Sequence, residues 1–248
     1  MADDHDERQL TLVVIATCIL TYLISRTLAK KKVQRRSKPG SEWDEVKFFS
    51  DINRAVPRQY TLIVDRSGSM SSSRWFSGSR WAEAERAVGH LAPHITKWDP
   101  DGVTCFFFSG SHKMYDNIKS SEDVKSMFKA ERPSGGTNLS GVLDAAFAEH
   151  FKRGGEDETI LVITDGQPND PAATKRSIIR AANRIKRNEQ LSVSFIQVGD
   201  DAGATEFLDG LDDDLVRQGA KFDIVDTVTC KEMQGLSFSQ LVEKSILD

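Results

Sequence analysis

Three short segments of this 248-residue chain carry oxygen-bearing side chains at spacings that suit a divalent cation. The apolar run Tyr60–Val64 is followed by the letters DRSGS, so Asp65, Ser67 and Ser69 place one carboxylate and two hydroxyls on a tight glycine-containing turn. Hard oxygen ligands with few formal charges suit Mg²⁺ or Mn²⁺, which prefer octahedral sites and retain several waters. Alone, this turn is a weak signal, because serine-rich turns after strands are common.

Two further segments add oxygen ligands of the same kind. Residues 134–139 read SGGTNL, in which two glycines permit a sharp turn and the threonine offers a hydroxyl. Residues 159–166 read TILVITDG, an apolar run that ends in an aspartate. The carboxyl ends of parallel strands meet at one edge of a sheet, where such folds bind ligands. The sequence therefore predicts one metal site, formed by Asp65, Ser67, Ser69, Thr137 and Asp165.

A structural role is the alternative for each of these residues taken singly. Asp and Ser side chains often cap turns and helices. The segment SGGTNL directly precedes a predicted helix, for which Thr137 would serve as an N-cap. The occurrence of all five residues in one chain favours the metal site.

The elements that must position these side chains follow from an alternation of apolar runs and amphipathic stretches. Near-continuous β-branched and aromatic runs are typical of strands buried on both faces. We expect strands at Tyr60–Val64, Val103–Phe108, Thr159–Ile163, Leu191–Val198 and Phe222–Val228, with an antiparallel edge strand at His112–Ile118. We expect helices at Ser79–Trp98, Glu122–Ala130, Ser140–Lys152, Asp170–Asn188 and Ala204–Gln218.

Strands that alternate with helices imply crossover connections and a mainly parallel sheet. The predicted fold class is therefore α/β, a doubly wound, mainly parallel sheet flanked by helices over residues 57–248. Two more helices are expected, a short one at Ser41–Val56 and a last one at Ser239–Ile246.

The start of the chain has a different composition. Residues 10–29 are moderately apolar and carry only one charge, Arg26, and twenty helical residues span about 30 Å, the thickness of a bilayer core. An acidic start and a basic end argue against a cleaved signal peptide. We expect a transmembrane helix at residues 10–29, preceded by a short acidic N-terminus (1–9) and followed by a basic linker and short helix (30–56).

A basic cluster predicts the orientation of this helix. Seven Lys and Arg residues lie between Arg26 and Lys38, which favours the cytosolic side of a membrane, or the stroma or matrix. The expected localisation is a single-pass membrane protein whose soluble domain faces that side. The endoplasmic reticulum and the mitochondrial outer membrane both remain open, because the span is only moderately apolar.

Charge and composition exclude several functions. Residues 1–40 hold eight of the 33 Lys and Arg and four of the 37 Asp and Glu, so the remainder has a net charge of −8. Such an acidic domain is a poor nucleic-acid binder. Three cysteines without a CxxC pair argue against a disulfide scaffold, and Cys105 lies in an apolar strand with no evident base. Nucleotide-binding, HExxH and GxSxG motifs are missing from the sequence.

The segments DRSGSM, GGTNL and ITDG, in this order, resemble the von Willebrand factor type A domain over about residues 57–248. In that family these positions form the metal-ion-dependent adhesion site, within a doubly wound sheet that has one antiparallel edge strand. The resemblance implies that Ser67, Ser69 and Thr137 coordinate the metal directly, and that Asp65 and Asp165 act largely through water. It also implies a partner protein that offers a Glu or Asp carboxylate, because an incompletely neutralised cation attracts one.

The predicted function is a membrane-anchored adaptor or scaffold that binds proteins with the help of Mg²⁺ or Mn²⁺, and not an enzyme. The alternatives are a structural subunit of a membrane complex and an adaptor of an AAA-type ATPase. A metal-dependent hydrolase is disfavoured because no general base accompanies the site. Trp75 and Phe76, in the polar stretch Ser69–Arg80, are predicted partner contacts, with packing onto the core as the alternative.

Overall fold

The computed structural model of the chain describes residues 58–74, 78–96, 101–199 and 201–228. Six of its strands form one sheet in the order β5-β4-β1-β6-β7-β8. Their bounds are β1 Gln59–Asp65, β4 Val103–Phe108, β5 His112–Ile118, β6 Glu158–Thr164, β7 Leu191–Gln197 and β8 Val225–Val228. All neighbouring strands run parallel except β5, which pairs with β4 in the antiparallel sense.

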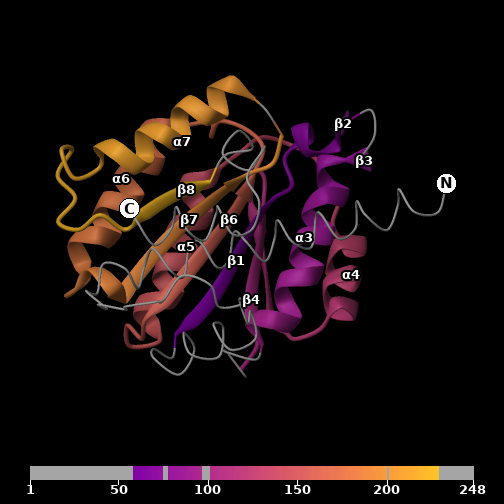
Figure 1. Cartoon of the computed structure of the whole chain (residues 1–248), viewed down its shortest axis with the longest axis horizontal. Coiled ribbons are helices and arrows are strands. Elements are labelled where there is room, and N and C mark those ends of the chain that lie inside the picture. The colour runs from indigo at the N-terminus through magenta and orange to yellow at the C-terminus, as the bar shows by residue number, and fades with distance from the viewer. Residues whose placement is uncertain (1–57, 75–77, 97–100, 200, 229–248) are drawn as a thin grey trace, which may run out of the picture.

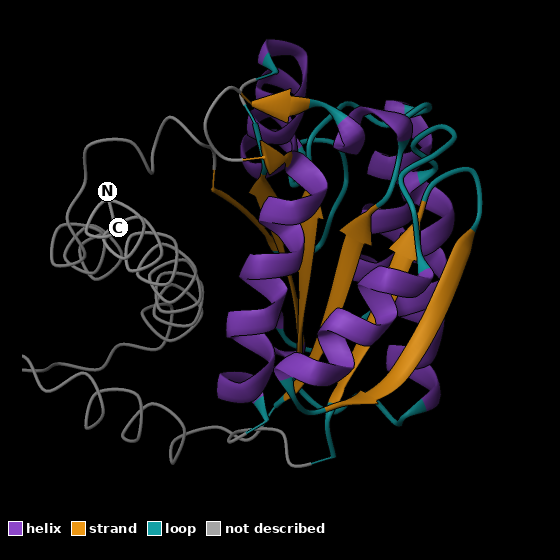
Figure 2. Cartoon of the chain, turned by 90° about the vertical axis from the view of Figure 1, so that its right-hand side faces the viewer, coloured by secondary structure: helices purple, strands orange, loops and turns teal. Residues whose placement is uncertain are grey.

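Helices cover both faces of this sheet (Figures 1 and 2). The helices α3 (Arg80–Ile95) and α4 (Ser121–Ala130) contribute apolar side chains to one core cluster. The helices α5 (Leu139–Lys152), α6 (Pro171–Arg184) and α7 (Ala202–Asp214) contribute to the other. Two single-turn 3₁₀ helices, η1 (Gly68–Ser71) and η2 (Asn188–Gln190), and a two-residue hairpin of β2 (Ser73–Arg74) and β3 (Gly78–Ser79) complete the fold.

Successive side chains of a strand point to opposite faces of the sheet, so they belong to different core clusters. In β1, Leu62 and Val64 belong to the α3–α4 cluster, whereas Ile63 belongs to the cluster on the other face. Both faces of the strand are therefore buried, which explains why its sequence is continuously apolar. Phe107 of β4 is fully buried, with its ring centroid 4.9 Å from that of Phe128 and 5.4 Å from that of Trp81.

The strand order reverses between β1 and β6. β1 pairs with β4 on one side and with β6 on the other, both in parallel, with Val64 opposite Phe107 and Ile163. Asp65 ends β1, and Asp165 directly follows the last residue of β6. The two carboxylates therefore leave neighbouring strands at the same edge of the sheet, at the reversal point where folds of this class bind ligands.

The predicted fold class and the edge strand His112–Ile118 are confirmed. The strand Val103–Phe108 has the predicted bounds, and each remaining predicted strand and helix of the described ranges is present with boundaries shifted by a few residues. The largest differences lie toward the C-terminus, where the last strand begins at Val225 and α6 ends at Arg184. Beyond Arg184 the backbone of Ile185 is extended, which ends the helix. The hairpin β2–β3 was not predicted, because two-residue strands leave no periodic signal.

The predicted localisation as a single-pass membrane protein is wrong. Within the described ranges, no helix is both long and apolar enough to cross a membrane. The longest of these helices, α3, has 16 residues and so extends about 24 Å, whereas a membrane span needs about 20 residues.

Several other predictions fall outside the described residues. These are the segments 1–9, 10–29 and 30–56, the helices predicted at Ser41–Val56 and Ser239–Ile246, and the partner contacts Trp75 and Phe76.

Truncating Phe107 to Ala should lower the free energy of unfolding by about 3–5 kcal/mol, because its fully buried ring is surrounded by Trp81, Tyr115 and Phe128. Met114→Ala is the matched control, since Met114 is 43% exposed and its loss should change stability by less than about 0.5 kcal/mol. Urea unfolding of both variants measures the difference. Equal effects of the two substitutions would contradict this description of the core.

Candidate metal-ion site

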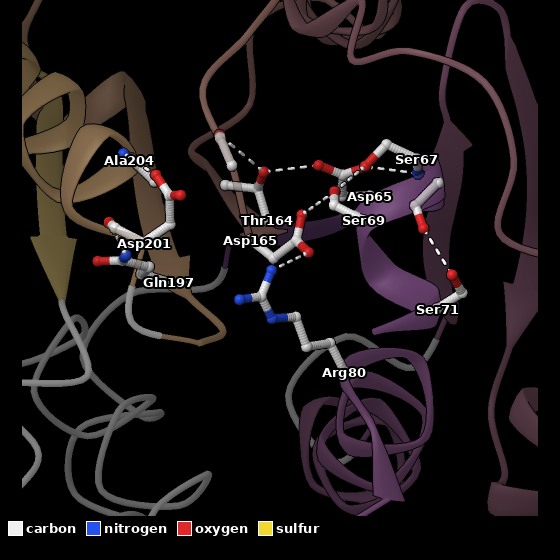
Figure 3. A network of polar contacts seen from close by, with 12 residues as sticks. Asp65, Ser67, Ser69, Ser71, Arg80, Thr164, Asp165, Gln197, Asp201 and Ala204 are labelled. Carbon is white, nitrogen blue, oxygen red and sulfur yellow. Dashed lines mark hydrogen bonds and ion pairs between the residues drawn. The ribbon is translucent and has the colours of Figure 1, made fainter. Parts of the chain in front are cut away.

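Asp65 is held at the end of β1 by two hydrogen bonds (Figure 3). The backbone N–H of Ser67 donates to its Oδ1 (2.7 Å), and the hydroxyl of Thr164 donates to its Oδ2 (2.7 Å). The carboxylate is fully buried. The bond from Ser67 closes the tight turn that directs the following residues back over the strand end.

The side chains of Ser67, Ser69 and Asp165 form a continuous chain of contacts (Figure 3). The hydroxyl oxygens of Ser67 and Ser69 lie 2.9 Å apart, and Ser69 donates a hydrogen bond to Oδ1 of Asp165 at 2.8 Å. Ser67 is the N-cap residue of η1, yet its hydroxyl makes no capping bond there. The side chain is thus directed into this chain of contacts, not into helix capping.

Thr137 belongs to a loop that is tied to the same turn by its backbone. Gly68 N–H donates to the carbonyl of Gly135 (3.1 Å), and Ser134 N–H donates to that of Arg66 (2.8 Å). Thr137 itself is buried, and its N–H donates to Oδ1 of Asn169 at 3.0 Å. The N-cap of α5 is Asn138, which accepts from Gly141 N–H, so Thr137 does not hold the capping position.

The charge of the site is concentrated on two buried carboxylates. Burial raises the pKa of Asp65 to about 6 from its usual 3.8, and the negative charge of Asp165 adds to this effect. The hydrogen bonds from Thr164 and Ser67 act in the opposite direction, because they favour the ionised carboxylate. Desolvation exceeds them, so an added positive charge would be favourable here.

Arg80, the first residue of α3, provides one such charge. Its Nη1 lies 2.8 Å from Oδ2 of Asp165, in an ion pair whose acidic side chain is fully buried. The Oδ1 of the same carboxylate accepts from Ser69. Asp165 therefore links the serine turn on one side with an arginine on the other.

These residues fit a small divalent cation by the chemistry of their donors. Two contacts of 2.8 and 2.9 Å join the Ser67, Ser69 and Asp165 oxygens. Adjacent oxygen ligands around Mg²⁺, at 2.0–2.1 Å from the ion, are about 2.9 Å apart. Within the described residues no group of three or more His, Cys, Asp or Glu side chains could hold a metal ion. A cation here would consequently depend on hydroxyl ligands, as Mg²⁺ or Mn²⁺ sites allow.

The structure brings four of the five predicted residues, Asp65, Ser67, Ser69 and Asp165, into contact through hydrogen bonds and the short turn. The fifth, Thr137, lies on the adjoining loop. Their role as metal ligands stays a prediction. Sequence reasoning missed Thr164, Asn169 and Arg80. Thr164 could have been found as the neighbour of Asp165 in the ITDG segment, whereas no pattern marks Arg80.

Comparison with protein families shows that residues 60–167 match the von Willebrand factor type A domain. A von Willebrand factor type A domain is therefore present in this part of the chain, whereas the sequence resemblance predicted one over about residues 57–248. The match includes the serine turn, the glycine-containing loop and Asp165. No curated protein matches the chain.

Several solved structures share the fold at low sequence identity. A variant of the PilB minor pilin of Streptococcus sanguinis has a TM-score of 0.52 at 13% identity, over 84% of this chain and 63% of that one. The pilus adhesin SpaC of Lactobacillus rhamnosus GG has a TM-score of 0.51 at 15% identity, over 77% of this chain and 30% of that one. The manganese-loaded TRAP protein of Plasmodium vivax has a TM-score of 0.44 at 16% identity, over 76% and 73%. At these identities, the likenesses to PilB and SpaC establish the fold alone.

The raised pKa of Asp65 predicts how stability depends on pH in the absence of divalent cations. The unfolded chain releases this proton near pH 3.8 and the folded chain near pH 6, so stability is lost as the pH rises between these values. The loss should reach about 3 kcal/mol by pH 7. Asp65→Asn removes the titrating group and should gain stability relative to the wild type over the same range.

Urea unfolding of both proteins at several pH values in metal-free buffer measures this difference. In the variant, the hydroxyl of Thr164 can rotate to accept from the new amide, so the site keeps a hydrogen bond. A constant difference between the two proteins from about pH 4 to about pH 7 would contradict the raised pKa.

Proposed function

We propose that this von Willebrand factor type A domain is a protein-binding module, an adaptor or scaffold, whose site holds Mg²⁺ or Mn²⁺ and binds a carboxylate of a partner protein. The observation that supports it most is the chain of contacts from Ser67 through Ser69 to Asp165. Ser69 already lies within contact distance of two other proposed ligands, Ser67 and Asp165, so binding a cation requires little rearrangement of the turn.

The proposed ligands leave a bound cation partly unneutralised and open to solvent. When bound, the ion would supply positive charge that attracts an external carboxylate. Ser67, Ser69 and Thr137 are neutral, and Asp165 already shares its charge with Arg80. Gly68, Ser69 and Gly135 are exposed, so a partner can approach the site from the carboxyl edge of the sheet.

A binding role without catalysis is part of the proposal. The titratable side chains in the contact network of this site are Asp65, Asp165 and Arg80, and each is already committed to a hydrogen bond or ion pair. Cys105 is fully buried, and burial raises the pKa of its thiol far above the usual value, which disfavours the nucleophilic thiolate. The fold of SpaC, a pilus adhesin, agrees in kind with a domain that binds other molecules.

The metal site is tested by calorimetric titration of Mn²⁺ and Mg²⁺ into the full-length chain. Ser67→Ala should weaken binding by about tenfold or more, because a contact between a hydroxyl and a charged group contributes about 1.5–3 kcal/mol. Ser71→Ala is the matched control, since the exposed Ser71 hydroxyl donates to the carbonyl of Gly68 within the same turn. Equal affinities of the two variants would contradict the proposed ligand set.

The protein-binding role is tested by capture of partners with the immobilised full-length chain, in Mg²⁺ and again with a chelator. Partners of the site should be retained by the wild type and by Ser71→Ala in Mg²⁺, and lost with chelator or with Ser67→Ala. Partners that remain bound under every condition would instead indicate a structural subunit whose contacts lie away from this site.

A further inference from the structure

Arg80 contacts Asp165, one of the two carboxylates of the proposed metal site (Figure 3). Its Nη1 contacts Oδ2 of Asp165 at 2.8 Å, while Oδ1 of that carboxylate contacts Ser69. The Arg80 side chain is 18% exposed and that of Asp165 is fully buried. A buried carboxylate is costly unless it is paired, so this contact compensates a charge that the core could not otherwise accommodate.

The backbone at Gly199 leaves a space that the guanidinium of Arg80 occupies. A Cβ atom built on Gly199 would lie 2.7 Å from Nε, 2.9 Å from Cζ and 3.0 Å from Nη2 of Arg80. Any side chain at this position would therefore displace the guanidinium. The positive φ of Gly199, 87°, also favours glycine. The arginine is thus held between the end of β7 and Asp165.

The same residue is anchored at its backbone. Arg80 N–H donates to the carbonyl of Ser72 at 3.1 Å, across the base of the β2–β3 hairpin. The first turn of α3 is thereby tied to the segment that follows η1. The position of the guanidinium is set by helix, hairpin and β7 end together.

We infer that Arg80 is an internal counter-cation for Asp165, and that it competes with a divalent cation for the negative charge of the site. The inference rests on the proposed metal site. A cation that approaches Asp165 meets a carboxylate already neutralised on one oxygen and a fixed positive charge nearby. Arg80 should therefore stabilise the metal-free domain and at the same time weaken metal binding.

The test compares Arg80→Gln, Arg80→Lys and wild type in the full-length chain. Without metal, Arg80→Gln should unfold at a lower temperature, because Asp165 loses its ion-pair partner. In calorimetric titration the same variant should bind Mn²⁺ about tenfold more tightly, within the range usual for coupled sites. Arg80→Lys keeps the positive charge but lacks the planar guanidinium. Its unfolding temperature and its Mn²⁺ affinity should therefore lie between those of wild type and Arg80→Gln.

Arg66→Gln is the matched control. Arg66 directly follows Asp65 in the sequence, but its Nε lies 3.5 Å from Glu131, outside the carboxylate pair of the site. Arg66→Gln removes one positive charge near the site, as Arg80→Gln does, but it should leave the Mn²⁺ affinity nearly unchanged. A gain in affinity equal to that of Arg80→Gln would reduce the effect to general electrostatics and overturn the inference.

A metal-free double-mutant cycle of Arg80→Gln with Asp165→Asn separates the ion pair from other effects of the arginine. Arg80→Gln should lower the unfolding temperature far less when Asp165 is already neutral. If wild type binds Mn²⁺ and Arg80→Gln binds it no more tightly, the inference fails and the proposed metal site stands. If neither protein binds Mn²⁺, both the competition and the proposed metal site are wrong.

Discussion

Two fully buried carboxylates, at the ends of adjacent parallel strands, constrain everything around them. Asp65 and Asp165 lie where β1 and β6 end, and neither could remain ionised there without compensating partners. The chain supplies hydrogen bonds from Thr164 and the Ser67 backbone to one, and a hydroxyl and a guanidinium to the other. The compensation of Asp65 is incomplete, since its pKa is raised to about 6. This residual electrostatic cost is what a bound cation would relieve.

The opposite edge of the sheet holds a third buried carboxylate. Glu158, the first residue of β6, is also buried, but it accepts hydrogen bonds from Thr61 and Arg153 and contacts Nδ1 of His150 at 2.8 Å. Both Glu158 and His150 are only 1% exposed, whereas the Arg153 side chain is 31% exposed. The carboxyl edge differs because Gly68 and Ser69 are open to solvent. The same fold therefore has a buried carboxylate at each end, and at the carboxyl end the turn beside it is exposed.

A site of this kind balances stability against binding. The more completely its own residues neutralise the carboxylates, the more stable the metal-free domain becomes and the less it gains from a cation. Neutral hydroxyl ligands shift this balance towards binding, because they contact a metal ion without cancelling its charge. Arg80 shifts the balance towards stability of the metal-free domain, because it neutralises part of the charge of Asp165. In this proposal, the affinity of the site for a cation thus depends in part on one arginine outside the proposed ligand set.

The sequence by itself determined the fold class and the approximate strands and helices, and it pointed to the five residues proposed as ligands, because buried parallel strands have a distinctive apolar pattern and their ends carry the polar residues. It misled on localisation, where the apolar run at residues 10–29 predicted a membrane protein that the described helices do not support. Only the tertiary structure decided which charges meet: Arg80 and Asp165 are 85 residues apart. Their contact depends on how α3 packs beside the end of β7 and on the space above Gly199, and local sequence patterns carry no information about such long-range packing.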